Sequence, residues 1–332
     1  MKRIKGQLSS LALALSLSGS LLSVPAYADS ASNYPEHPIN LVVGYPAGGS
    51  VDLNGRLLAE ALGEKLGEKV IVENLGGAGG IIGAQKVVRA KPDGYTLLVG
   101  SINEVTIAQL INPSVKYDGA KDLLPVGLIG TQPLLLAASA QSGIKTPEDF
   151  VKLAESGKSD SYSFGSSGVG TSLHLGGEMI NIATGAKVLH IPYKGVAPLV
   201  TDLGSGQLNF GMFVLSSGLP QVKSGKIVPI GITDTKRSAL APEIPALSEN
   251  SHFKDVDLNI WFGLFGPKDM PEPVVKKLQT ALSAVLADPA FQEKYKSTGG
   301  TVMAQQPDLS TFFVAEHQKF EKLVKTVGIG LK

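Results

Sequence analysis

The sequence contains no cysteine among its 332 residues. Disulfide bonds, thiol catalysis and thiolate metal sites are therefore excluded. Histidine is also scarce, and its spacing matches neither HExxH nor any other metal-binding pattern. We therefore expect no bound metal and no cofactor. The five histidines are His37, His174, His190, His252 and His317.

An excess of charge of either sign is lacking as well, since 30 Lys and Arg face 29 Asp and Glu, for a formal net charge of +1. This balance gives no electrostatic reason to expect nucleic acid or an anionic membrane as a partner. Nucleotide motifs are absent too, because the glycine-rich stretch at 77–82 does not fit GxGxxG and no Walker A sequence occurs. Beyond the N-terminus, no apolar run approaches the ~20 residues of a membrane-spanning helix.

The N-terminus has the pattern of a secretory signal peptide. Basic residues at 2–5 precede an apolar run at 11–22 and the sequence Ala-Tyr-Ala at 26–28. This apolar run is too short to span a membrane. We expect export to the periplasm with cleavage after Ala28, so that the mature chain begins at Asp29. The ~300 residues that remain predict two domains.

Glycine, in contrast, is abundant, with 39 residues that cluster between expected strands and helices. An apolar strand at 39–43 leads into adjacent glycines at 48–49 and a helix that begins near Ser50 or Asp52. Unpaired N–H groups in the first helical turn and the positive end of the helix dipole bind anions, and glycine lets a ligand approach the backbone. Asp52 can cap the same amides or pair with Arg56. The alternative interpretation of this stretch is an ordinary strand-to-helix turn.

The rest of the chain alternates strands and helices on a short period, which predicts an α/β fold with parallel strands. Further strands are expected at 70–72 and 95–99. A long apolar run at 126–138 is interpreted as a strand that passes between two domains. A return strand is expected at 260–265 and a long final helix at 309–327. The loops that follow the parallel strands should then line one edge of the sheet.

A second set of glycine and hydroxyl residues, at 165–172, also lies between a strand and a helix. Ligands of open α/β sheets bind at the carboxyl ends of strands, and clefts between domains are favoured sites. Two such loops facing each other across a cleft predict capture of a carboxylate between closing lobes. The alternative is a hydrolase in which Ser166 or Ser167 acts with His174, although the GxSxG spacing is not met.

Several short motifs, in their order and spacing, resemble one family across essentially the whole chain after the signal peptide. They are Pro-Ala-Gly-Gly-Ser-Val-Asp at 46–52, Val-Glu-Asn at 72–74, Gly-Ala-Gly-Gly at 77–80, Pro-Asp-Gly-Tyr-Thr-Leu at 92–97, Ser-Gly-Val-Gly-Thr at 167–171 and Ile-Pro-Tyr-Lys-Gly at 191–195. The chain resembles the extracytoplasmic solute-binding receptors of tripartite tricarboxylate transporters, also called the Bug family.

The resemblance implies a type II periplasmic-binding-protein fold with a ligand cleft between two lobes. We place one lobe at 33–130 plus 235–332 and the other at 131–234. The implied function is not enzymatic: a monomer binds a small organic acid (a mono-, di- or tricarboxylate, aromatic acids included) and delivers it to membrane subunits. The ligand-binding residues are then Tyr45, Gly48, Gly49, Ser50, Asp52, Ser101, Asn103, Ser166, Ser167, Gly170, Thr171, His174, Tyr193 and Asp202.

The sequence also departs from the family pattern. The family commonly has Phe where Tyr45 stands, and small hydroxyl residues near Asn103 and Glu104. Glu104 would repel a carboxylate unless it points away or meets a ligand amine or hydroxyl group. The partner stays open, because a sensory receptor that docks a membrane kinase is the alternative to transport. The single tryptophan, Trp261, follows the expected second crossover, so its emission is expected to report lobe closure.

Overall fold

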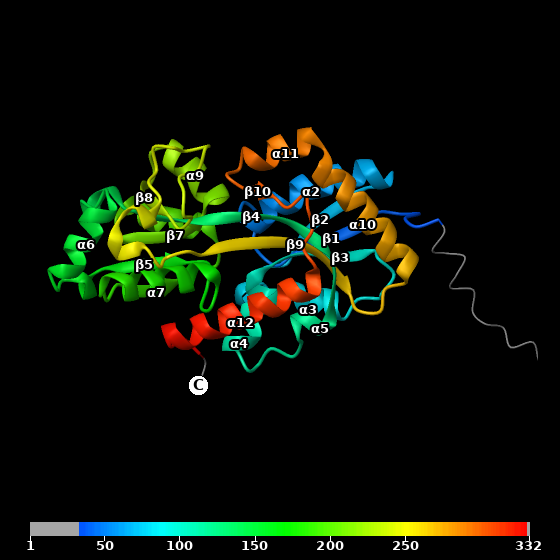
Figure 1. Ribbon diagram of the computed structural model, residues 1–332, viewed down its shortest axis with the longest axis horizontal. Coiled ribbons are helices and arrows are strands. Elements are labelled where there is room, and N and C mark those ends of the chain that lie inside the picture. The colour runs from blue at the N-terminus through cyan, green and yellow to red at the C-terminus, as the bar shows by residue number, and fades with distance from the viewer. Residues whose placement is uncertain (1–32, 331–332) are drawn as a thin grey trace, which may run out of the picture.

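The computed structural model describes residues 33–330 as two α/β lobes (Figure 1). The predicted signal peptide, residues 1–28, lies outside this range. A 10-stranded sheet runs through both lobes in the order β2-β1-β3-β9-β4-β7-β5-β6, and β8 and β10 also pair with β4. The strands are β1 (Ile39–Val43), β2 (Val70–Asn74), β3 (Thr96–Ser101), β4 (Leu123–Ala138), β5 (Ser163–Ser166), β6 (Leu189–Pro192), β7 (Phe210–Val214), β8 (Val228–Ile232), β9 (Asn259–Pro267) and β10 (Thr301–Val302).

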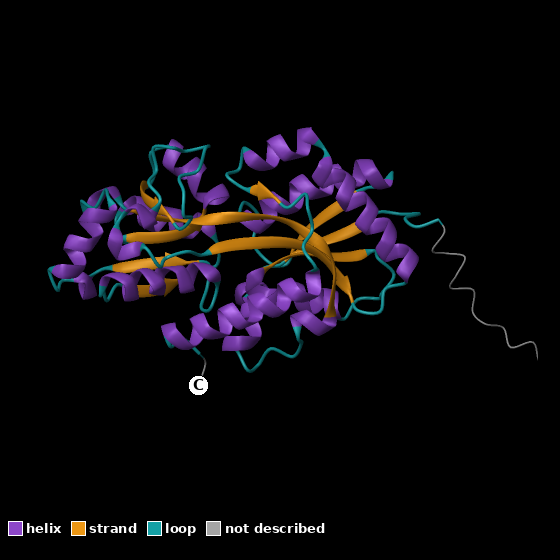
Figure 2. Ribbon diagram, in the orientation of Figure 1, coloured by secondary structure: helices purple, strands orange, loops and turns teal. Residues whose placement is uncertain are grey.

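Helices pack on both faces of the strands in each lobe (Figure 2). Within residues 33–330, no helix is both long enough and apolar enough to cross a membrane. The helices are α2 (Ser50–Leu66), α3 (Ile81–Val88), α4 (Ala108–Ile111), α5 (Gly119–Asp122), α6 (Pro147–Glu155), α7 (Ser172–Thr184), α8 (Val196–Ser205), α9 (Leu215–Lys223), α10 (Glu272–Ala287), α11 (Pro289–Lys296) and α12 (Leu309–Val327), with a π-helical turn, η2, at Asn103–Ile107.

The first lobe is organised around β1, a buried strand of Ile, Leu and Val side chains. It pairs in parallel with β2 and β3, as the alternating pattern predicted. The loop after β1 turns at Gly48, whose φ of 83° favours glycine, and α2 begins directly after Gly49. Helix α2 ends at Gly67 in the left-handed conformation that a C-cap requires. Parallel pairing brings the loops after β1, β2 and β3 to one edge of the sheet.

Two long strands connect the lobes. β4 and β9 run side by side across the molecule and pair antiparallel, with register shifts near Gly127 and Gly130 (Figure 1). β9 continues the first lobe by pairing with β3, and β4 continues the second by pairing with β7. The crossings predicted at 126–138 and 260–265 are therefore confirmed. Any movement of one lobe relative to the other must bend or twist this pair of strands.

The second lobe repeats the strand–loop–helix unit, with β5 parallel to both β6 and β7 and α7 following the loop. Its helix α6 begins with the expected Thr146 cap, which forms a capping box with Asp149. The segment after β8 packs on this lobe too, since the ring of Phe253 lies 6.3 Å from that of Phe150 on α6. The lobe boundaries at 131 and 234 stay a prediction, and this packing argues for a second boundary near 258.

The final helix, α12, lies against both lobes, beside α4 of the first and α7 of the second (Figure 1). It covers Trp261 of β9, which is buried. The indole Nε1 donates a hydrogen bond to Glu316 Oε2 at 2.9 Å, and the rings of Phe312 and Phe313 pack edge-on at 5.8 and 5.4 Å. The tryptophan therefore joins a crossing strand to the helix that bridges the lobes.

This contact predicts unequal effects for two glutamates on α12. Glu316→Ala leaves the buried indole N–H of Trp261 without its acceptor, so the free energy of unfolding should fall by about 1–3 kcal/mol. Glu321→Ala removes only an exposed ion pair with Lys325 and should cost about 0–1 kcal/mol. Urea unfolding followed by tryptophan emission measures both. Equal losses in the two variants would contradict the structural role of the Trp261–Glu316 bond.

Candidate functional site

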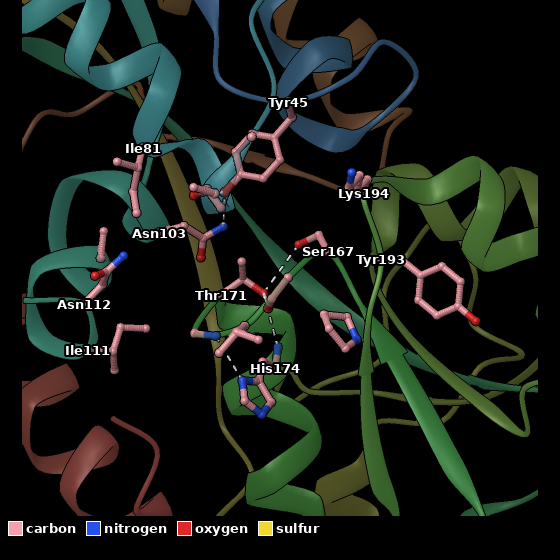
Figure 3. A pocket seen from close by; sticks show the side chains of 18 of the residues that line it. Tyr45, Ile81, Asn103, Ile111, Asn112, Ser167, Thr171, His174, Tyr193 and Lys194 are labelled. Carbon is pink, nitrogen blue, oxygen red and sulfur yellow. Dashed lines mark hydrogen bonds between the residues drawn. The ribbon is translucent and has the colours of Figure 1, made fainter. Parts of the chain in front are cut away.

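A cavity of about 1070 Å³ lies between the lobes (Figure 3). The loops after β1 and β2, together with η2 and α4, form its wall on the first lobe. The loops after β5 and β6 form the wall on the second lobe, and the residues that follow α12 complete it. Every loop that the sequence predicted at the sheet edge therefore faces one space.

A smaller cavity, of about 40 Å³, lies between the N-termini of α2 and α7. A water-sized group needs ~10–15 Å³ by this measure, so there is room for a group the size of a carboxylate. The smaller cavity contacts Gly49, Ser50 and Val51 of the first loop and Ser172 of the second. Residues that line both cavities, and so connect them, are Tyr45, Pro46, Asn103 and Ser167.

At the start of α2, Asp52 forms the predicted ion pair with Arg56, but it accepts from the loop before the helix and not from the amides of the first helical turn. Its Oδ2 accepts from the Gly48 amide at 2.9 Å and from Arg56 Nε at 3.0 Å, while Oδ1 accepts from Asn74 Nδ2 at 2.8 Å. Burial would raise the pKa of Asp52, but these hydrogen bonds outweigh it and lower the pKa. Asp52 and Gly48 therefore hold the loop and line neither cavity, whereas Ser50 lines the smaller one.

At the start of α7, several polar groups remain without partners. Thr171 caps the helix by accepting from the His174 amide. The Ser167 and Val169 amides have no acceptor among the described residues. Ser172 lines the smaller cavity, and its hydroxyl is fully buried and has no hydrogen-bond partner in residues 33–330. A buried hydroxyl without a partner is costly, so Ser172 is a candidate to hydrogen-bond a group bound at the smaller cavity.

A hydrogen-bond network joins the two lobes beside both cavities. The Tyr45 hydroxyl donates to Gly79 O at 2.7 Å and accepts from Asn103 Nδ2 at 2.9 Å. Asn103 Oδ1 then accepts from the Ser172 amide of the second lobe at 2.8 Å. Tyr45 thus helps to fix the position of Asn103, and through it the position of α7.

Glu104 lines neither cavity and lies beneath Tyr45. Its carboxylate accepts from the Ser101 amide at 2.7 Å and the Ser101 hydroxyl at 2.8 Å. Burial raises its pKa from 4.5 to about 7, although the hydrogen bonds from Ser101 oppose the shift. Gly80 leaves room for this group, since a Cβ there would lie 2.8 Å from Glu104 Oε2. Glu104 therefore points away from both cavities, and its raised pKa favours the protonated, neutral form. Both features reduce the repulsion of a ligand carboxylate that the sequence led us to expect.

The two histidines of the second lobe stack, with ring centroids 3.7 Å apart. His174 lines the larger cavity, and its Nδ1 accepts from the Gly170 amide at 3.0 Å. Ser166 Oγ lies 2.7 Å from Nε2 of His190, whose pKa falls to about 4 because of burial and the neighbouring His174. Ser166 is buried and lines neither cavity, and Ser167 Oγ contacts only Thr171 Oγ1, at 3.4 Å. Neither serine forms the predicted pair with His174, which removes the geometric basis of the hydrolase alternative.

Several residues named from the sequence lie behind the cavity wall. Tyr193 lines the larger cavity, yet its hydroxyl points away and donates to Asp202 Oδ2 at 2.7 Å (Figure 3). Predicted residues that line a cavity are Tyr45, Gly49, Ser50, Asn103, Ser167, Gly170, Thr171, His174 and Tyr193. Those that line neither are Gly48, Asp52, Ser101, Ser166 and Asp202.

Sequence reasoning missed an apolar part of the wall. It consists of Ile81, Ala108, Ile111, Val169 and Ile329, together with the polar Asn112. Lys194 lines the same cavity and is the one cationic side chain that lines either cavity within residues 33–330. In the same range, no group of three or more His, Asp or Glu side chains is arranged to hold a metal.

The raised pKa of Glu104 predicts how stability depends on pH. Between about pH 4.5 and 7 the folded protein keeps this proton and the unfolded chain releases it, so stability falls as the pH rises through that window. The slope is about 1.4 kcal/mol per pH unit at most. The Glu104→Gln variant has no titrating group at this position and should lack this pH dependence. The wild type should therefore lose stability relative to the variant from pH 5 to 8.

Urea midpoints at each pH measure this difference. Glu321→Gln is the control, because the hydrogen bond from Lys325 lowers the pKa of that exposed carboxyl and leaves it ionised throughout the range. Parallel curves for the wild type and Glu104→Gln would mean that Glu104 is already ionised at pH 5.

Comparison with known proteins places the chain in a family. Residues 55–329 match the family described as "Tripartite tricarboxylate transporter family receptor". The chain is 30% identical over 305 residues to the protein BugT of Bordetella pertussis, a match that covers 91% of this chain and 93% of BugT. It is 33% identical over 326 residues to an Agrobacterium vitis protein named for the TAR-I ttuE-ttuC' intergenic region, covering 97% of this chain and 93% of the relative.

Solved structures agree in fold. The periplasmic binding protein BugD superposes with a TM-score of 0.84 at 35% identity, covering 90% of this chain and 100% of BugD. MatC from Rhodopseudomonas palustris, solved with malate, gives 0.81 at 27% identity and covers 88% of this chain and 100% of MatC. An R. palustris protein solved with adipate gives 0.85 at 28% identity, covering 90% of this chain and 99% of that protein. These matches confirm the predicted two-lobe binding-protein fold, and the chain belongs to the tripartite tricarboxylate transporter receptor family.

Proposed function

We propose that the protein captures a small organic carboxylate between its lobes and presents it to the membrane subunits of a tripartite tricarboxylate transporter. The observation that carries this proposal is the smaller cavity, where the N-termini of α2 and α7 meet and the buried Ser172 hydroxyl has no partner within residues 33–330. Helix N-termini favour anions, and a carboxylate oxygen accepts hydrogen bonds from amides and hydroxyls alike. The malate and adipate in the R. palustris structures support this ligand class.

Amides and hydroxyls, rather than a salt bridge, hold the anion in this proposal. Arg56 is the cation nearest the N-terminus of α2, but its side chain is 54% exposed, pairs with Asp52 and lines neither cavity. Hydrogen bonds to a charged group contribute roughly 1.5–3 kcal/mol each. Four of them at the upper end of this range, less about 4 kcal/mol for association, give about −8 kcal/mol, which corresponds to micromolar affinity.

Capture proceeds by closure of the lobes about β4 and β9. In the structure the lobes already touch, through the bond from the Ser172 amide to Asn103 and through Ile111, whose side chain packs directly on Gly170. A ligand bound to both loops stabilises this closed arrangement, because it contacts the two walls together only when they are close. The transporter then recognises the closed form.

Substitutions at Ser167 test the way the anion is held. Ser167→Asp places a like charge beside the carboxylate and should abolish binding, while the melting temperature stays near that of the wild type. Ser167→Ala should weaken binding only by about one hydrogen bond, or 0.5–1.5 kcal/mol. Calorimetry with a panel of carboxylates, preceded by a thermal-shift screen, measures both. Normal binding by Ser167→Asp, or complete loss in a folded Arg56→Ala variant, would show that the mechanism is wrong.

Delivery to a transporter also requires export, which we propose from the signal-peptide pattern. Protein purified from the periplasm of its native host should begin at Asp29 because cleavage follows Ala28. Mass spectrometry of the intact protein measures the N-terminus. An intact Met1, or protein confined to the cytoplasm, would contradict this assignment.

A further inference from the structure

The wall of the larger cavity is divided by polarity. The polar residues Ser167, Thr171 and Asn103 line the larger cavity, and Ser167 and Asn103 also line the smaller one. The apolar side of the cavity is formed by Ile81 at the start of α3 and Ile111 at the end of α4, which lie away from Ser167 and Lys194 (Figure 3). Ile111 also packs on Gly170 of the loop after β5. Ile329, which follows α12, adds a third apolar side chain to the lining. A ligand that enters the smaller cavity with one end must therefore place its other end in apolar surroundings.

The charges divide in the same way. Lys194 projects into the larger cavity on the side of Ser167, close to the polar end (Figure 3). Among the described residues, the polar side chains that the first lobe contributes to the lining are those of Tyr45, Asn74, Asn103 and Asn112, and none of them is a cation. A second carboxylate placed on the apolar side would lose its hydration without gaining a cation, and an uncompensated buried charge is strongly unfavourable. This arrangement disfavours dicarboxylates whose second group would reach the apolar side.

The size of the cavity sets the length of the ligand. A volume of about 1070 Å³ is at the upper end of the ~300–1,000 Å³ typical of sites for drug-sized molecules. Val169, 56% exposed and part of the lining, presents further apolar surface that a ligand can cover. A short, fully polar acid would leave this surface in contact with water.

We propose that the ligand is an amphipathic monocarboxylate, with its carboxylate in the smaller cavity and a chain or ring of about six or more carbons against Ile81, Ile111 and Ile329. This inference rests on the proposed function and narrows it. It assigns ligand selection to α3, α4 and the residues after α12, whereas the loops after β1 and β5 hold the carboxylate common to all candidates.

Matched acids test the inference by calorimetry on the full mature chain. Octanoate and suberate have the same number of carbons and differ by one carboxylate, and butyrate and malate are short references. Octanoate should bind at least tenfold more tightly than suberate. Along the series from butyrate to octanoate, affinity should rise up to about fourfold for each methylene that becomes buried.

Two neighbouring residues of α3 provide a variant and its control. Ile81→Lys places a cation on the apolar side, so suberate should gain affinity and octanoate should lose it. Ile82→Lys adds the same charge one residue later, where the side chain is 45% exposed and lines neither cavity, and it should change neither affinity. The preference of Ile81→Lys for suberate over octanoate is the readout, because a folding defect would weaken both acids alike.

The possible results separate the two proposals. Tighter binding of suberate or malate than of octanoate, or an affinity that does not change with chain length, overturns the monocarboxylate inference and leaves carboxylate capture intact. Lys332, two residues beyond Gly330 and outside the described residues, is tested with Lys332→Gln. If suberate binds tightly to the wild type and weakly to Lys332→Gln, the lysine pairs with the second carboxylate of suberate. That result would overturn the inference. If no acid of either class binds, the proposed function itself fails.

Discussion

The hydrogen bond from the Ser172 amide to Asn103 Oδ1 is the contact on which the geometry of the site depends, because it joins α7 of the second lobe to the first. A carboxamide suits this position, since its NH₂ donates to the Tyr45 hydroxyl while its oxygen accepts from the second lobe. An aspartate here would lose the donor and add a buried charge. The bond holds the N-terminus of α7 against η2 of the first lobe, and both residues line the smaller cavity.

Binding an anion without a salt bridge requires that negative groups near the site be neutralised, and the structure neutralises each in a different way. Asp52 lies in the first turn of α2, where Arg56, Asn74 and the Gly48 amide surround its carboxylate. Glu104 lies under Tyr45, where burial raises its pKa to about 7, so that near neutral pH a proton removes much of its charge. Both groups shape loops of the cavity wall, and neither would oppose an incoming carboxylate with a full, unpaired charge.

The sequence predicted the parts of this arrangement that local pattern determines. Strand β1, helix α2 with its Gly67 cap, the crossings β4 and β9 and helix α12 have clear periodicity or turn residues, and the structure confirms them. It did not distinguish Ser166 from Ser167, since adjacent residues at a strand end face opposite sides and the register decides which one reaches the cavity. The sequence analysis also missed η2 and the four-residue α4, because both are too short to show a helical period. It missed Ile329 as well, because this residue reaches the cavity only through the packing of α12.

The sequence predicted some parts of the site and missed others for one physical reason, which is that the two halves of the site are encoded in different ways. Anion binding uses backbone amides at helix N-termini, and the glycine and hydroxyl residues that expose them leave a visible motif. The apolar side uses ordinary Ile and Ala side chains of α3, α4 and the segment after α12, which a sequence cannot separate from core residues. Substitutions there change the space and polarity offered to the ligand without touching the loops that hold its carboxylate. A receptor built this way can change ligands through residues that carry no motif, while the family's recognisable motifs stay the same.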